Sequence, residues 1–211
     1  MRNWPLSELS VTTPRLQLRH PSLDDVDELA DRAAEGIHDP GYMPFLFPWS
    51  DTTPEERARS VVQYQFRAWG SFSVDSWTIE LAVVHEGRIV GVQSINAKNF
   101  PVTREVETGS WVAQRFHGQG IGTEMRRAVL HLAFAGLGAH YAVTTAFEDN
   151  HASLGVTKKL GYKEDGIALH ARGDKPVVVR RFRMAREDWT ESPGFAIHNL
   201  DRCLPLFGLS S

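Results

Sequence analysis

One stretch of the chain limits the possible folds more than any other, because it joins a strand to a helix through a glycine-rich loop. Residues 106–113 have the character of a strand, and an apolar stripe typical of a helix begins near Ile121. Between them lie Gly118, Gly120 and Gly122. Glycine has no Cβ and tolerates positive φ, so successive backbone N–H groups can converge on one point, toward which the helix dipole also directs its positive end. The stretch therefore predicts a site that holds a diphosphate mainly through backbone.

Three kinds of glycine-rich phosphate loop differ in the residues around the glycines. A Walker A loop ends in Gly-Lys-Ser/Thr, whereas residues 122–124 read Gly-Thr-Glu. A dinucleotide-binding fingerprint needs a third glycine where Thr123 stands, and no βαβ unit begins before this loop. The remaining pattern is Q/R-x-x-G-x-G/A, which Gln114 or Arg115 opens and Gly118 and Gly120 close.

A second block of residues strengthens this third interpretation. It comprises residues 150–153 (Asn-His-Ala-Ser), 159–162 (Lys-Leu-Gly-Tyr) and 165–166 (Asp-Gly). Together the loop and this block resemble the GCN5-related N-acetyltransferase (GNAT) superfamily, and within it the ribosomal-protein alanine acetyltransferase-like branch with its N-x-x-S…K-L-G-F…E-G segment. The resemblance covers roughly residues 10 to 189.

The order of the predicted elements agrees with an α/β fold. Alternation and capping signals predict strands at 15–19, 77–85, 88–97, 105–113, 141–147, 162–172 and 176–185, and helices after Ser22, after Thr53, at 120–137 and at 150–160. This order predicts a mixed central sheet with helices on both faces. The resemblance further implies that the strand before the glycine loop splays from its neighbour.

The resemblance also implies which residues bind coenzyme A. The loop amides would hold the pyrophosphate, and the backbone near Trp111 and Val112 would pair with the pantetheine arm, which Asn150 would also contact. The full set of implied cofactor-binding residues is Trp111, Val112, Gln114, Arg115, His117, Gly118, Gln119, Gly120, Ile121, Gly122, Thr123, Asn150 and Ser153.

Transfer of an acyl group from a thioester to an amine requires a base for the amine and a proton source for the leaving thiolate. By resemblance Ser153 lies near the thioester sulfur and protonates the thiolate or orders the water that does so. Many members of the superfamily carry a tyrosine as general acid where this chain has Thr157. The leading candidates for the base are Glu107 and Asp165, each of which can also be interpreted as a solvated surface charge. Glu105 has the same strand parity as Glu107.

Residues 36–53 form an irregular segment that is rich in aromatic side chains. In the resembling branch this region lines the pocket for the acceptor or the acyl group. The substrate-binding candidates are Tyr42, Phe45, Phe47 and Trp49; the alternative is that they fill the core. An apolar pocket here would disfavour a long basic peptide as acceptor.

Composition limits the cellular setting and the partners. The net charge of -3 argues against nucleic acid or an anionic membrane as partner, and the single cysteine, Cys203, suits a reducing compartment. With no apolar run long enough for a signal peptide or a membrane span, we expect a cytoplasmic protein. No histidine or cysteine spacing matches a zinc site, so we expect no metal.

The sequence divides into an acyltransferase domain at residues 1–189 and an extension at 190–211, which carries Phe195, Ile197, Leu204, Leu206 and Phe207. Such an apolar extension should pack on its own body or, as we slightly favour, on a partner subunit, which implies a homodimer or higher homo-oligomer.

The predicted function is acyl-CoA-dependent transfer of an acetyl or succinyl group to a primary amine of a small molecule or protein, by direct attack in a ternary complex. The alternative is a coenzyme A-binding sensor or assembly module without turnover.

Overall fold

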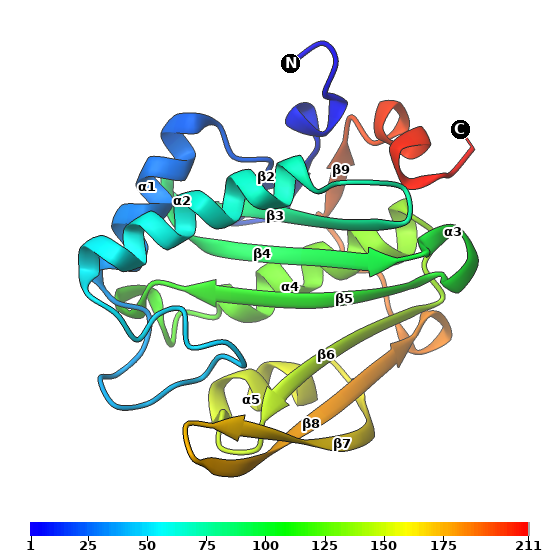
Figure 1. Cartoon of the computed structure of the whole chain (residues 1–211). Helices are drawn as coiled ribbons and strands as arrows, with labels where there is room; N and C mark the ends of the chain where they lie inside the picture. The colour runs from blue at the N-terminus through cyan, green and yellow to red at the C-terminus, as the bar shows by residue number, and fades with distance from the viewer. Residues whose placement is uncertain (211) are drawn as a thin grey trace.

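The computed structural model describes residues 1–210, in which nine strands form one mixed sheet (Figure 1). The strand order is β7-β8-β6-β5-β4-β3-β2-β1-β9, and every neighbouring pair is antiparallel except β5 and β6. The strands are β1 (Ser10–Thr12), β2 (Leu16–Arg19), β3 (Ser76–His85), β4 (Arg88–Lys98), β5 (Glu105–Val112), β6 (Tyr141–Phe147), β7 (Lys163–Arg172), β8 (Lys175–Ala185) and β9 (Ala196–His198). The prediction of a mixed α/β sheet is confirmed.

Helices cover both faces of this sheet. Helices α1 (Leu23–Glu35) and α2 (Pro54–Gly70) lie on one face, and α4 (Ile121–His131) and α5 (His151–Lys159) lie on the other (Figure 1). Ser22 and Thr53 close capping boxes at the starts of α1 and α2, so the two predicted helix starts are confirmed. Short turns complete the chain: η1 (Pro5–Glu8), α3 (Phe100–Thr103), η2 (Gln114–Phe116), η3 (Leu132–Gly136), η4 (Arg186–Asp188) and η5 (Asp201–Phe207).

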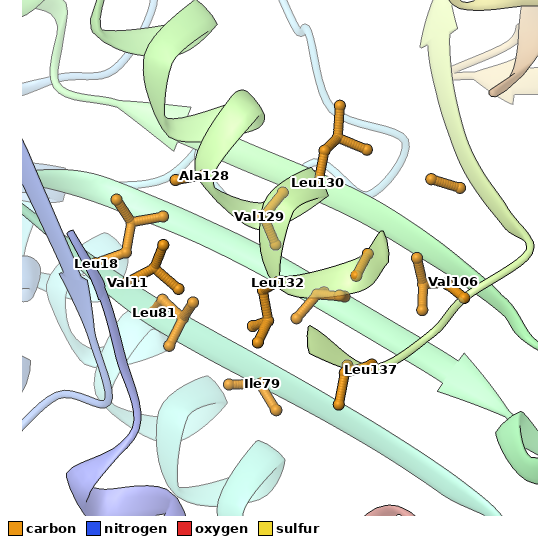
Figure 2. Close-up of a cluster of buried hydrophobic side chains, with 14 of the residues drawn as sticks. Val11, Leu18, Ile79, Leu81, Val106, Ala128, Val129, Leu130, Leu132 and Leu137 are labelled. Atoms are coloured by element: carbon orange, nitrogen blue, oxygen red, sulfur yellow. The ribbon is translucent and has the colours of Figure 1, made fainter. Parts of the chain in front are cut away.

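The main hydrophobic core lies between the sheet and α4. Figure 2 shows Ala128, Val129 and Leu132 from this helix region packed over Leu81 and Val106 of the sheet. A smaller core, which includes Leu29 and Val92, lies under α1 and α2 on the other face. The predicted apolar stripe of α4 is therefore confirmed, although the regular α-helix ends at His131 and a π-helical turn follows it.

The C-terminal extension packs against the body of the same chain. Strand β9 pairs with β1, which places Ile197 opposite Val11 at the edge of the sheet. Cys203 and Phe207 are fully buried, and the Phe207 ring contacts that of Trp77 at a centroid distance of 5.0 Å. The apolar side chains that the sequence marks in this extension thus find partners within the chain.

Glu80 is a carboxylate on β3, on the face of the sheet that α2 covers. Its side chain is buried, and this burial raises its pKa to about 8, although the Tyr64 hydroxyl partly offsets the effect by hydrogen bonding. In the unfolded chain the same group titrates near 4.5. Between these two pH values only the folded protein holds the proton, so stability falls as pH rises through this window.

We therefore expect Glu80→Gln to stabilise the protein at pH 8.5 by several kcal/mol, since each pKa unit is worth about 1.4 kcal/mol. Well below pH 4.5 the advantage should vanish, because both states of the wild-type protein are then protonated at this position. Urea unfolding of both proteins across this range measures the difference. A difference that stayed constant with pH would show that Glu80 ionises normally in the folded state.

Candidate functional site

The glycine loop presents a run of free backbone donors at the start of α4. Gly118 and Gly120 adopt φ values of 75° and 80°, a conformation that glycine enters without strain. Gly120 caps α4 without help from any side chain. Within residues 1–210, the N–H groups of residues 118–122 have no hydrogen-bond acceptor, whereas those of Thr123 and Glu124 bond to the Gly120 carbonyl. Five consecutive amides at a helix N-terminus form a site suited to an anion.

The polar side chains of this loop turn back toward the protein. The Gln114 amide donates to Asp39 Oδ1 at 2.5 Å, and Arg115 forms an ion pair with Glu35 at 3.2 Å. His117 Nε2 lies 2.8 Å from the Val112 carbonyl oxygen. The Gln119 side chain donates to the Arg115 carbonyl. These four candidates therefore shape the loop, and the donors that remain are mainly backbone.

The strands β5 and β6 separate soon after they meet. They pair over only three positions, from Glu105↔Tyr141 to Glu107↔Val143. Beyond them β5 stays paired with β4 as far as Val112, whereas its backbone pairing with β6 stops before Thr108. The two implied pantetheine contacts, Trp111 and Val112, lie beyond this point. The splayed strand pair that the resemblance implies is confirmed.

The carboxylates near the splay have different partners. Arg183 bonds to both Glu105 and Asp165, and Asp165 also pairs with Arg181 at 2.9 Å. Glu107 has no ion pair or hydrogen-bond partner within residues 1–210. Desolvation raises the pKa of Glu107, and the negative charge of Glu105 raises it further. An unpaired carboxylate with a raised pKa is better suited to accept a proton than one held between guanidinium groups.

Asn150 and Ser153 begin helix α5 at the end of β6. Asn150 Oδ1 accepts a hydrogen bond from the Ser153 N–H at 3.0 Å, and its Nδ2 donates to the Pro44 carbonyl at 3.3 Å. Asn150 therefore joins α5 to the segment at 36–53. The Ser153 side chain is half-buried, whereas Thr157 is completely buried and its hydroxyl has no partner among the described residues. Thr157 is thus shielded from any substrate in this structure.

The segment at 36–53 brings two of its aromatic candidates to β5. The ring of Trp49 lies 6.1 Å from that of Trp111 and 5.3 Å from that of Phe45. The Tyr42 hydroxyl donates to the Asp149 carbonyl beside Asn150. Phe47 lies apart from this group, with 76% of its surface exposed. Three of the four substrate-binding candidates therefore gather around the open end of the splay.

Sequence reasoning missed two buried ionisable side chains, Glu80 on β3 and Arg126 on α4. Glu80 has the alternating pattern of a strand residue, and Arg126 lies off the apolar stripe of α4, so both look like surface positions. Arg126 is only 4% exposed, whereas Arg127 beside it is exposed. Both arginines lie between Met125 and Ala128, so no local signal separates the buried one from the exposed one.

Residues 1–210 contain neither a membrane-spanning helix nor a cluster of metal ligands. No helix in this range is long and apolar enough to cross a membrane. No group of three or more histidine, cysteine, aspartate or glutamate side chains in the same range is arranged to hold a metal ion.

The sequence and the fold both match known acetyltransferases. The sequence profile of the acetyltransferase (GNAT) domain matches residues 15–163. The "Putative ribosomal N-acetyltransferase YdaF" of Bacillus subtilis (strain 168) is 30% identical over 124 residues, which cover 57% of this chain and 67% of that protein.

Solved structures with similar folds include RimL, a ribosomal alpha-N-protein acetyltransferase in complex with coenzyme A. It has a TM-score of 0.66 and 20% identity, over 83% of this chain and 97% of RimL. A GNAT-family acetyltransferase from Bacillus anthracis has the same TM-score and 18% identity, over 84% of this chain and 99% of that one. The matched profile, the loop at the start of α4 and the splayed strands lead to one conclusion: this chain belongs to the GNAT acetyltransferase family, in the branch similar to ribosomal-protein acetyltransferases.

Proposed function

We propose that this protein transfers an acetyl or succinyl group from acyl-coenzyme A to a primary amine, by direct attack within a ternary complex. The observation that carries the proposal is the run of five free backbone amides at residues 118–122, at the N-terminus of α4. A diphosphate matches this site in charge and in hydrogen-bonding capacity. Bound acyl-coenzyme A would supply the activated acyl group, so the chain itself needs no nucleophile.

Within this proposal the residues of the chain divide the work. The amides of residues 118–122 hold the diphosphate, and Thr123 lies beside them in the first turn of α4. The open edge of β5 near Trp111 and Val112 orients the pantetheine arm and donates to the acyl carbonyl, and Asn150 contacts the same arm. Glu107 accepts a proton from the amine directly or through water. Ser153 donates a proton to the leaving thiolate or orders the water that does so. Asp165 is the weaker candidate base, because two arginines hold it.

The acceptor approaches from the segment at 36–53. Phe45, Trp49 and Trp111 form an aromatic surface there, and Tyr42 and Asn150 border it. The names of YdaF and RimL point to a protein amine as acceptor, whereas the aromatic surface also suits a small apolar amine. We propose an amine acceptor of either kind, and a cytoplasmic homodimer or higher homo-oligomer remains our prediction for the assembly.

A second function is favoured by one observation. Thr157 stands where many members of the superfamily have a tyrosine acid, and it is completely buried. If Ser153 and water do not replace that acid, the protein binds coenzyme A without turnover, as a sensor or assembly module. Retained acyl-CoA binding without transfer to a panel of amines would favour this alternative.

The first test is calorimetric titration of the purified protein with acetyl-CoA, succinyl-CoA and NADH in parallel. We expect saturable binding of at least one acyl-CoA and no heat of binding from NADH, because the loop lacks the dinucleotide fingerprint. A preference between the two acyl groups would identify the donor. If neither acyl-CoA binds, the loop has been misinterpreted and the proposed function is wrong.

A further inference from the structure

Arg126 is a buried cation without a buried anion. It extends from α4 toward the sheet and is 4% exposed. Its Nη1 donates to the Thr144 hydroxyl at 3.1 Å, and its Nη2 donates to the Ser110 hydroxyl at 3.2 Å. Its Nε has no acceptor, and the guanidinium forms no ion pair within residues 1–210. Desolvating a charge is costly, so an apolar side chain would serve packing better at this position.

The two hydroxyls that Arg126 contacts belong to the two splayed strands. Backbone pairing of β5 with β6 ends at Glu107↔Val143. Directly beyond this point, the Thr108 hydroxyl donates to the Val143 carbonyl at 3.4 Å, and the Thr144 hydroxyl donates to the Thr108 carbonyl at 3.0 Å. Arg126 then spans the wider gap from Thr144 to Ser110. Side chains of increasing reach thus replace the ladder of backbone hydrogen bonds as the strands separate.

The same part of β5 is also held from its other side. Gln93 on β4 is fully buried, and its Nε2 donates to the Gly109 carbonyl at 2.7 Å and to the Ser94 carbonyl at 3.1 Å. Gln93 of β4 therefore holds Gly109, and Arg126 of α4 holds the next residue of β5, Ser110. The position of β5 next to the opening is fixed by buried polar contacts on both sides.

We propose that Arg126 is a positioning residue of the acyltransferase: by joining Ser110 to Thr144 it sets the width of the opening between β5 and β6. The β5 backbone beyond Ser110 then meets the acyl end of the donor at a fixed place. This inference rests on the proposed function for its effect on turnover. The bridge itself can be tested without activity.

The first experiment compares Arg126→Met with Arg127→Met by hydrogen exchange. Arg127 is exposed on the same helix and forms no hydrogen bond or ion pair through its side chain within residues 1–210, so its variant controls for the loss of a helical arginine. We expect amides at residues 108–113 and 144–148 to exchange at least 10-fold faster in Arg126→Met, while the β3–β4 hairpin at 76–98 stays unchanged. Unchanged exchange in both segments, in a folded Arg126→Met variant, would overturn the bridge.

The second experiment separates binding from turnover. Coenzyme A without an acyl group is held mainly by the loop amides, to which Arg126 makes no hydrogen bond, so its affinity for Arg126→Met should stay within 3-fold of wild type. The kcat with saturating acyl-CoA should fall at least 10-fold, and Arg126→Lys should recover part of it, because an ammonium group can still reach one hydroxyl. A parallel loss of coenzyme A affinity and kcat would show a merely structural role for Arg126 and contradict the inference.

A double-mutant cycle with Thr144→Val adds an internal check. If both residues act through one bridge, the loss of kcat in the double variant should equal that of the stronger single variant. Additive losses would contradict a shared role. Should the wild-type protein bind no acyl-CoA at all, the proposed function fails, and the hydrogen-exchange comparison still decides whether Arg126 holds the strands.

Discussion

Replacing Gly120 by tryptophan should weaken coenzyme A binding by about 100-fold or more, which corresponds to roughly 3 kcal/mol. Gly120 sits at a φ of 80°, within the run of free amides, and caps α4. An added Cβ would lie 3.4 Å from Arg15 Nη2, so a tryptophan would crowd this end of the loop, and it would also strain the backbone. Calorimetric titration with coenzyme A measures the loss.

The control for this variant must carry the same backbone strain at a distance from the loop. Gly161 follows α5 with a φ of 86°, and a Cβ added there would have no neighbour within 4 Å. Gly161→Trp should therefore bind coenzyme A as the wild-type protein does. Equal affinities in both variants would place the diphosphate elsewhere and remove the main support for the proposed function.

The second large effect is expected from Glu107→Gln, which should lower kcat/KM by about 100-fold or more, the usual contribution of a general base. The wild-type pH–rate profile should rise with pH through the pKa of Glu107, which desolvation and the charge of Glu105 hold above its ordinary value. In the variant this acidic limb should disappear. Steady-state rates between pH 4 and 9 provide the measurement.

Replacing the neighbouring carboxylate, Glu105→Gln, should shift the pH–rate profile without removing its acidic limb. Removing the Glu105 charge lowers the pKa of Glu107, so the acidic limb should move to lower pH while the plateau rate is largely retained. Asp165→Asn tests the competing base. If Asp165→Asn abolishes the limb and Glu107→Gln keeps it, the base has been assigned to the wrong carboxylate.

The parts of the fold that could be predicted from sequence depend on neighbouring residues. Thr53 and Glu56 form a capping box within one turn, and the strand, glycine loop and helix around residues 105–131 are contiguous. Their signals need no knowledge of the rest of the chain. The two-stranded hairpins at β3–β4 and β7–β8 were predictable for the same reason.

What sequence could not provide depends on distant parts of the chain. Arg126 and Arg127 are identical neighbours on one helix, and only the position of the splayed strands decides that the first is buried. Strand β9 has only three residues, and it becomes a strand because it pairs with β1, where His198 lies opposite Ser10 from the other end of the chain. The same holds for the polar side chains of the loop, whose partners Glu35 and Asp39 lie far away in sequence.

The packing of the C-terminal extension gives the protein a built-in chemical reporter. Cys203 is the chain's single cysteine, and its burial where the extension packs on the body raises its thiol pKa to about 11. The thiolate is the form that reacts with thiol reagents, and in the folded state this sulfur is both shielded and almost wholly protonated near neutral pH. The rate at which a thiol reagent labels Cys203 therefore reports how often the extension detaches, without an engineered cysteine and without an assay of turnover.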